Sequence, residues 1–154
     1  MKWVTRARPK VDRIACPWLI RRFIDPTAEF LYVPRDEVLA VAEREGGYSF
    51  DAGGATYSHR KQPDGHEWCT FETLIHEFHL ETDPALMELA RVVHAADVAA
   101  DVESHPFGAA LRAIGEAGSD VENDDQRLLD RASFVYDALY AHFQHAQLQP
   151  GSVG

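Results

Sequence analysis

The sequence predicts an α+β fold, in which a small N-terminal β-sheet packs against a mainly α-helical C-terminal cluster. Two observations support this prediction. Short segments with the β-branched and aromatic character of strands fall within the first sixty residues. Beyond residue 70, apolar residues recur at the three- and four-residue spacing of helices that bury one face. The chain of 154 residues, 45% of them hydrophobic, has the size of one domain.

The first part of the chain is predicted to alternate strands and helices. Asp25-Pro26 should end the first helix, because the residue before a proline is pushed out of helical geometry. Gly53-Gly54 is typical of a tight turn and predicts a hairpin of two short strands. The expected elements are a strand at 2–6, a helix at 13–24, a strand at 29–33, a helix at 36–45, and the hairpin strands at 48–51 and 55–59.

The second part is predicted to be a polar loop followed by helices. Residues 60–68 contain Pro63-Asp64-Gly65 and are expected to form the loop. Thr70 is a suitable N-cap for the first helix. Further helices are expected at 85–98, 106–117 and 125–146, and the tail 147–154 should be flexible.

The charge is unevenly distributed. Residues 1–24 hold seven basic side chains and one acidic one, whereas the remaining 130 residues hold eight basic and 24 acidic ones. The net charge of −10 argues against nucleic-acid or anionic-membrane binding. The basic N-terminal end could instead attract a small anion, although a solvated face that pairs with the acidic remainder explains the pattern equally well.

The sequence has no membrane or export signal. No run reaches the roughly 18 apolar residues that a spanning helix needs, and the N-terminus has no apolar signal core. We therefore expect a cytoplasmic protein whose two cysteines, Cys16 and Cys69, are reduced. Cys16 lies in the basic segment, where its thiol pKa could be lowered for a redox role, but a buried inert thiol is the commoner case.

Asp97 is predicted to direct a carboxylate toward the core, because it continues the apolar stripe of the predicted helix 85–98. A buried carboxylate is costly unless it is paired, hydrogen-bonded or bound to a metal. His94 lies three residues earlier, so both side chains can face one site. Alternatively, Asp97 caps a neighbouring helix or pairs with Arg21 or Arg22.

His59 ends a predicted strand, a position from which a side chain reaches into a cleft. Together with His94 and Asp97 it would form a ligand set that suits a divalent transition metal such as zinc, iron or manganese. Glu72 and Asp125 are further candidate oxygen ligands, although each alone also fits an acid at a helix start.

Glu72 also belongs to a second pattern, E-x3-H-x2-H, with His76 and His79. This pattern falls on one side of a helix and competes as a metal site. It flanks the apolar stripe at the wet edge, which favours a surface cluster.

Several segments together resemble the C-terminal domain of chromate resistance protein B. The opening KWVTRARPKVDRIACPWLIRRFID at 2–25 and FLYVP at 30–34 carry most of the resemblance. Weaker matches follow at FD 50–51, His59, CTF 69–71, HAAD 94–97 and YDALYA 136–141. The resemblance covers nearly the whole chain and implies one domain of this type at 1–146.

The resemblance implies a role in chromate resistance or sensing. It places five basic residues in the family's opening motif, where guanidinium groups suit tetrahedral oxyanions such as chromate. These residues are Arg6, Arg8, Lys10, Arg21 and Arg22. Full-length members are described as regulators with an additional N-terminal region, which the printed sequence lacks, so we do not expect this chain to bind DNA.

Three functional interpretations follow from the sequence. The first is a domain that binds a metal, an oxyanion or both. The second is a metal-dependent hydrolytic or redox enzyme that uses the same His/Asp site. The third is a structural or interaction domain in which Asp97 is paired with an arginine. The sequence leaves open whether the chain forms a homo-oligomer.

Overall fold

The computed structural model describes residues 1–148 and confirms the α+β fold. No helix within these residues has the length and apolar character needed to cross a membrane. The elements are β1 (Lys2–Arg6), α1 (Asp12–Leu19), the π-helical turn η1 (Ile20–Ile24), β2 (Glu29–Val33), the 3-10 turn η2 (Arg35–Glu37), α2 (Val38–Glu45), β3 (Tyr48–Ser49), β4 (Arg60–Lys61), β5 (Glu67–Trp68), α3 (Thr70–Glu77), α4 (Pro84–Asp97), the 3-10 segment η3 (Ala99–Ser104), α5 (Gly108–Val121) and α6 (Asp125–Leu148).

A parallel sheet of three strands forms the N-terminal part, in the order β2-β1-β3. Residues of β1 alternate between two faces, as the period of a strand requires. Val4 packs with Val38 and Val41 of α2 in a small apolar cluster, whereas Trp3 belongs to the main core on the other side. Both faces of the central strand are therefore buried, which is usual for parallel sheets.

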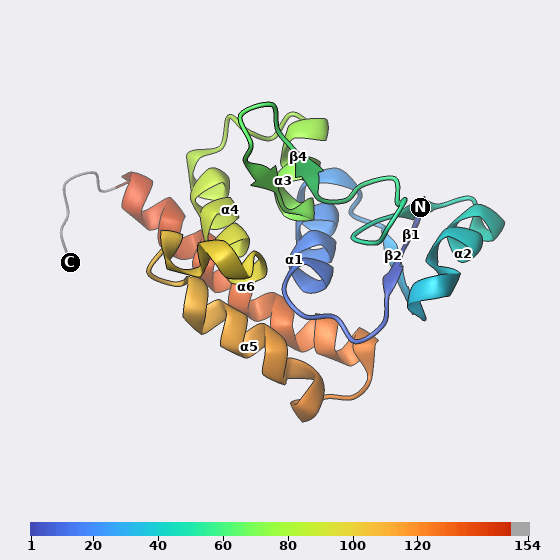
Figure 1. The fold of residues 1–154 in the computed structure, drawn as a ribbon. Helices are drawn as coiled ribbons and strands as arrows, with labels where there is room; N and C mark the ends of the chain where they lie inside the picture. Colours follow the sequence, from blue (N-terminus) through green and yellow to red (C-terminus); the bar gives the residue numbers. More distant parts are fainter. Residues whose placement is uncertain (149–154) are drawn as a thin grey trace.

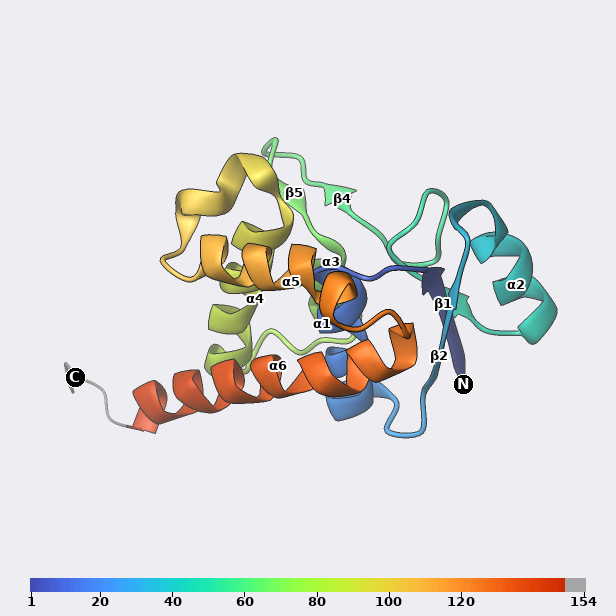
Figure 2. The same ribbon diagram turned by 90° about the horizontal axis from the view of Figure 1, so that it is seen from below.

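Helix α1 lies between the sheet and the C-terminal helices, and α2 covers the outer face of the sheet (Figure 1). The main core is formed where α1 meets α3, α4 and α6, around buried residues such as Leu19, Leu74 and Leu89. Helix α6 runs along the helical layer beside α5, and α2 lies at the opposite end of the molecule (Figure 2). The two layers thus share α1 as their common element.

The predicted hairpin around Gly53-Gly54 is wrong. Only residues 48–49 form a strand, and it pairs in parallel with β1. Phe50 and Tyr57 form an isolated bridge instead of an antiparallel ladder. Tyr48 pairs with Trp3 in the buried central strand β1, a partner that a local hairpin cannot provide. Tertiary pairing therefore overrides the turn signal.

The predicted loop 60–68 is instead a short hairpin. Strands β4 and β5 are antiparallel, and the amide of Gln62 donates to the carbonyl of His66 over 2.7 Å. Gly65 has a φ of 90°, which a side chain would disfavour. The strands are two residues long and exposed at β4, so they leave no alternating pattern in the sequence.

The predicted helices are present with shifted ends. Cys69, not Thr70, is the N-cap of α3, because the Thr70 hydroxyl points inward and donates to Asp51. Helix α5 extends to Val121, beyond the predicted end at residue 117. Of the predicted tail 147–154, Gln147 and Leu148 continue α6, and residues 149–154 lie outside the described part of the chain.

Gly47 fixes the approach of α2 to the sheet. A Cβ atom there would lie 2.2 Å from the carbonyl oxygen of Lys2 in β1. We expect Gly47→Ala to lower the free energy of unfolding by about 1–3 kcal/mol, because backbone atoms would have to move. Gly53→Ala is the matched control, since a Cβ there meets nothing within 4 Å. Urea denaturation checks this, and equal midpoints for the two variants would contradict it.

Candidate functional site

Polar side chains meet at the carboxyl edge of the parallel sheet, where the N-termini of α1 and α3 also converge. Arg6 ends β1, Asp51 follows β3, and Asp12 is the first residue of α1. The amide of Thr70, at the start of α3, donates to Asp12 Oδ2 over 2.9 Å. Ligand sites of open parallel sheets lie at this edge.

Asp12 is the most deeply buried acid of the site, with 1% of its surface exposed. Its Oδ1 atom has no hydrogen-bond partner among the described residues. Burial raises the pKa of this carboxyl well above its usual value, and the nearby Asp97 charge raises it further. A buried carboxylate with a free oxygen requires a positive partner or a proton.

His59 brings three carboxylates together. Its Nε2 atom lies 3.0 Å from Asp97 Oδ2, 3.5 Å from Asp12 Oδ2 and 3.6 Å from Asp51 Oδ1. Its Nδ1 atom faces Glu67 Oε1 at 3.7 Å. Pairing with Asp12, and next with Asp97, raises the pKa of His59 to about 11. The imidazolium is thus the positive partner of these carboxylates.

Asp51 is held in a constrained conformation. Its φ of 51° lies in the left-handed region, which costs free energy for a residue other than glycine. The surrounding groups fix it there: Thr70 Oγ1 donates to its Oδ1 over 2.8 Å, and Arg6 Nε donates to its carbonyl oxygen over 3.0 Å. Arg13 Nε lies 3.6 Å from Oδ2. The two arginines offset part of the negative charge of the site.

A second histidine cluster lies on the other side of the β4–β5 hairpin. His94 Nδ1 is 2.5 Å from Glu72 Oε1, and Nε2 is 2.6 Å from Asp101 Oδ2. Glu72 Oε1 also accepts the amide of Cys69 over 3.0 Å. Hydrogen bonding to Glu72 is the main cause that raises the pKa of His94 to about 9. This cluster borders a separate surface hollow.

The structure divides the predicted ligand set. His59 and Asp97 lie in one cluster, whereas His94 and Glu72 lie in the other. Asp125, the first residue of α6, is in neither cluster. Its carboxylate instead accepts a hydrogen bond from the amide of Arg8. Three acids that sequence reasoning missed complete the clusters: Asp12, Asp51 and Asp101. Asp12 offered a signal, since it is the one acid among residues 1–24 and lies near the start of a predicted helix.

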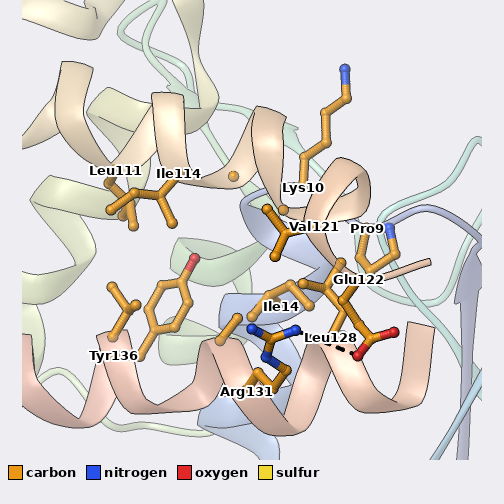
Figure 3. Close-up of a pocket in the computed structure, with 14 residues that line it drawn as sticks. Pro9, Lys10, Ile14, Leu111, Ile114, Val121, Glu122, Leu128, Arg131 and Tyr136 are labelled. Carbon is orange, nitrogen blue, oxygen red and sulfur yellow. Dashed lines mark ion pairs between the residues drawn. The ribbon is translucent and has the colours of Figure 1, made fainter. Parts of the chain in front are cut away.

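The five predicted oxyanion residues do not form one site. Arg6 lies at the candidate site, whereas Arg21 and Arg22 face Asp130 and Asp137 of α6. Lys10 extends away from an apolar pocket whose wall includes Ile14, Leu111 and Tyr136 (Figure 3). The amide of Arg8 donates to Asp125 Oδ2 at the start of α6 over 3.1 Å. Arg35, which the sequence reasoning did not select, borders the same hollow as Arg6 and His59.

Both thiols are buried in the core. Burial raises the pKa of Cys16 and of Cys69 well above the usual range, and neighbouring carboxylates add to it. The lowered pKa considered for Cys16 is therefore wrong, because its side chain lies on the inner face of α1, away from the exposed arginines. Burial therefore disfavours the thiolate form at both positions.

The competing E-x3-H-x2-H pattern is not brought together as a cluster. Glu72 faces His94, and the ring of His76 stacks on Trp68 with centroids 4.1 Å apart. His79 adopts a positive φ of 55° after the end of α3. The three side chains therefore do not share one ligand position in the described residues.

The fold and the site define a small α+β domain with a buried carboxylate–histidine centre at the carboxyl edge of its sheet. The chain belongs to the family described as "ChrB, C-terminal domain", whose profile matches residues 3–143. It is 39% identical over 144 residues to "Protein ChrB" of Cupriavidus metallidurans. That match covers 92% of this chain and 40% of the relative, so the chain spans less than half of the relative's length. No solved structure matches the chain significantly.

The raised pKa of His59 predicts a pH dependence of stability. The pKa of His59 in the folded protein, about 11, exceeds the ordinary value of 6.5. The pairing of the charged ring with Asp12 and Asp97 therefore stabilises the folded state fully below pH 6.5. This contribution declines above pH 6.5 and is lost as the pH rises through 11. In chelator-treated protein, the stability difference between wild type and His59→Gln should therefore narrow from pH 6 to pH 10.

Urea denaturation across this pH range measures that difference. Imidazole nitrogen NMR, with His59 assigned from the variant, should show a charged ring at pH 8. A ring that titrates near pH 6.5 would contradict the described pairing.

Proposed function

We propose that this domain binds one divalent transition metal ion through Asp12, His59 and Asp97, and that the loaded centre serves chromate resistance by binding a small oxyanion. The observation that carries the proposal is the buried Asp12 carboxylate with its unpartnered Oδ1. A protein rarely buries such an atom without a ligand or an ordered water to satisfy it. The family described as "ChrB, C-terminal domain" and the relative named "Protein ChrB" support the resistance role.

The interatomic distances support a shared ion. Two ligands that are each roughly 2.1 Å from one ion, at tetrahedral or octahedral angles, lie about 3.0–3.5 Å apart. His59 Nε2 lies 3.0 Å from Asp97 and 3.5 Å from Asp12. The 3.5 Å spacing to Asp12 is long for a hydrogen bond, whereas the 3.0 Å spacing to Asp97 is that of one, and both spacings suit two ligands of one metal. Glu67, near Nδ1, would orient the ring as outer carboxylates do at metal sites.

The donor set indicates the class of ion. One imidazole and two or three carboxylates suit manganese, iron or zinc, whereas soft ions prefer thiolates. Neither thiol belongs to the cluster of Asp12, His59 and Asp97, so they do not supply ligands there. Binding would displace the proton from His59, since a ligating imidazole is neutral.

An anion is the expected further ligand of the loaded centre. A dication with Arg6, Arg13 and Arg35 would exceed the combined charge of Asp12, Asp51, Asp97 and Glu67 by one unit. His59 is 34% exposed toward a hollow that Arg6 and Arg35 also line. Arg35 is exposed and has no ion pair within residues 1–148. A guanidinium beside an open metal position suits a tetrahedral oxyanion.

Binding explains these features better than the other two interpretations. A purely structural role would pair Asp97 with Arg21 or Arg22, but both arginines face α6. A redox enzyme that uses a thiol would need an accessible thiolate, which burial opposes at Cys16 and Cys69.

The metal centre is tested by counting bound ions. Chelator-treated protein is incubated with Mn²⁺ or Zn²⁺, separated from free ion and analysed for metal. We expect Asp12→Asn to lose one ion per chain relative to wild type, with affinity at least about 100-fold weaker, because even an outer partner contributes 10–100-fold. The amide keeps the shape of Asp12 and its acceptor for Thr70, so the fold should persist.

Asp125→Asn is the control, because Asp125 lies outside both clusters and should keep the wild-type ion count. His59→Gln and Asp97→Asn should behave like Asp12→Asn. Folded variants at all three positions that retain the wild-type ion count would overturn the proposed centre.

Anion binding is tested separately with chromate and sulfate. We expect each to bind metal-loaded protein, and Arg35→Gln to weaken binding by about 10-fold, the usual size of one charge-assisted hydrogen bond. Arg44→Gln removes an exposed arginine outside this hollow and should leave binding unchanged. Isothermal titration calorimetry measures both, and equal affinities for the two variants would contradict the assigned anion position.

A further inference from the structure

We propose that the apolar pocket between α1, α5 and α6 binds a small apolar carboxylate, of about the size of a substituted benzoate. The pocket has a volume of about 210 Å³ and includes Lys10 and Arg131 among its lining residues (Figure 3). It shares no lining residue with the proposed metal centre of Asp12, His59 and Asp97. The proposal therefore goes beyond that centre and does not depend on it.

Aliphatic side chains from three helices line the pocket. Ile14 of α1, Leu111 of α5 and Leu128 of α6 are buried there. Ile114 and Val121 of α5 also border the pocket, although 51% and 70% of their surfaces are exposed. Water around such side chains is unfavourable, so an apolar occupant that covers them would be stabilised by the hydrophobic effect.

Two glycines of α5 border this space. A Cβ atom at Gly115 would lie 2.8 Å from Val11 Cγ2, so this glycine lets α5 approach the start of α1. At Gly118 the nearest atom to a Cβ would be Leu128 Cδ1, at 3.2 Å. That atom is the end of a flexible side chain, so packing alone does not require a glycine there. Glycine is unfavourable within a helix, but at Gly118 it leaves the pocket wider.

The volume of the pocket indicates the size of its occupant. An apolar cavity of roughly 150 Å³ accommodates benzene. Drug-sized ligands occupy sites of roughly 300–1,000 Å³. A pocket of about 210 Å³ lies between these limits and suits one substituted ring.

The charges beside the pocket favour an anionic head group. The Glu122 side chain is 15% exposed, and its Oε1 lies 3.5 Å from Arg131 Nη1, so this acid already has a partner. Lys10 is exposed and has no ion pair within residues 1–148. Its flexible stem extends into solvent (Figure 3), so the ammonium group can turn toward a carboxylate. One unpaired positive charge beside an apolar pocket complements an apolar molecule with one carboxylate.

The site is tested with 4-ethylbenzoate and with the neutral amide of the same shape, 4-ethylbenzamide. NMR titration follows the methyl signals of Ile14 and Ile114, which border the pocket. We expect both probes to shift these signals and the benzoate to bind about threefold tighter, the size of one exposed ion pair. Lys10→Gln should remove this preference. Lys61→Gln, at an exposed lysine of β4 outside the pocket, is the control and should keep it.

A side chain that fills the pocket should block both probes. Ala132 of α6 is half-buried in the lining, so Ala132→Leu should weaken both affinities at least 10-fold. Ala141→Leu places the same side chain on the exposed face of the same helix and should bind as wild type. Gly118→Val blocks the pocket from α5 and provides a second variant if Ala132→Leu does not fold. Thermal unfolding checks that each variant is folded.

Four outcomes would overturn the proposal. The first is methyl signals that do not change with millimolar 4-ethylbenzoate, and the second is wild-type affinity in folded Ala132→Leu or Gly118→Val protein. The third is equal affinity for the benzoate and the benzamide, which would exclude the assigned ligand class. The fourth is a dependence of the signals on protein concentration that Ala132→Leu removes, because a second copy of the chain would then cover the pocket.

Discussion

The carboxylate of Asp12 is buried where the N-termini of α1 and α3 meet, and the arrangement of the site follows from compensating its charge. The amide of Thr70 satisfies Oδ2, and His59 approaches from the surface side. The positive ends of two helices favour an anion at this point. Because the strands β1 and β3 end here, Arg6 at the end of β1 and Asp51, two residues after β3, belong to the same cluster.

The buried acids constrain the chemistry. The carboxylates of Asp12, Asp51, Asp97 and Glu67 are balanced only while His59 is protonated and Arg6, Arg13 and Arg35 remain nearby. In the proposed loaded state the ion takes the place of that proton, and the balance becomes positive. An anion-binding function would then depend on the metal, which explains why a protein of net charge −10 could hold an oxyanion at an edge of its sheet.

The β4–β5 hairpin connects the two clusters. His59 precedes it, Glu67 in β5 faces His59 Nδ1, and His66 lies at its tip. On the other side, α4 supplies Asp97 to one cluster and His94 to the other, one helical turn apart. The hairpin carries few buried side chains and is held partly by the ion pair of Arg60 with Glu77. A displacement of this hairpin would therefore move side chains that border both clusters.

The sequence by itself determined the fold class and most helices, because periodicity records which face of an element is buried. It also identified His59 and His94 as candidates. Only the tertiary structure decided that they belong to different clusters and that Asp12, Asp51 and Asp101 complete them. The strand at 48–49 and the positions of the arginines likewise depended on packing. Contacts between residues far apart in the chain leave no local pattern, so no spacing rule could have predicted them.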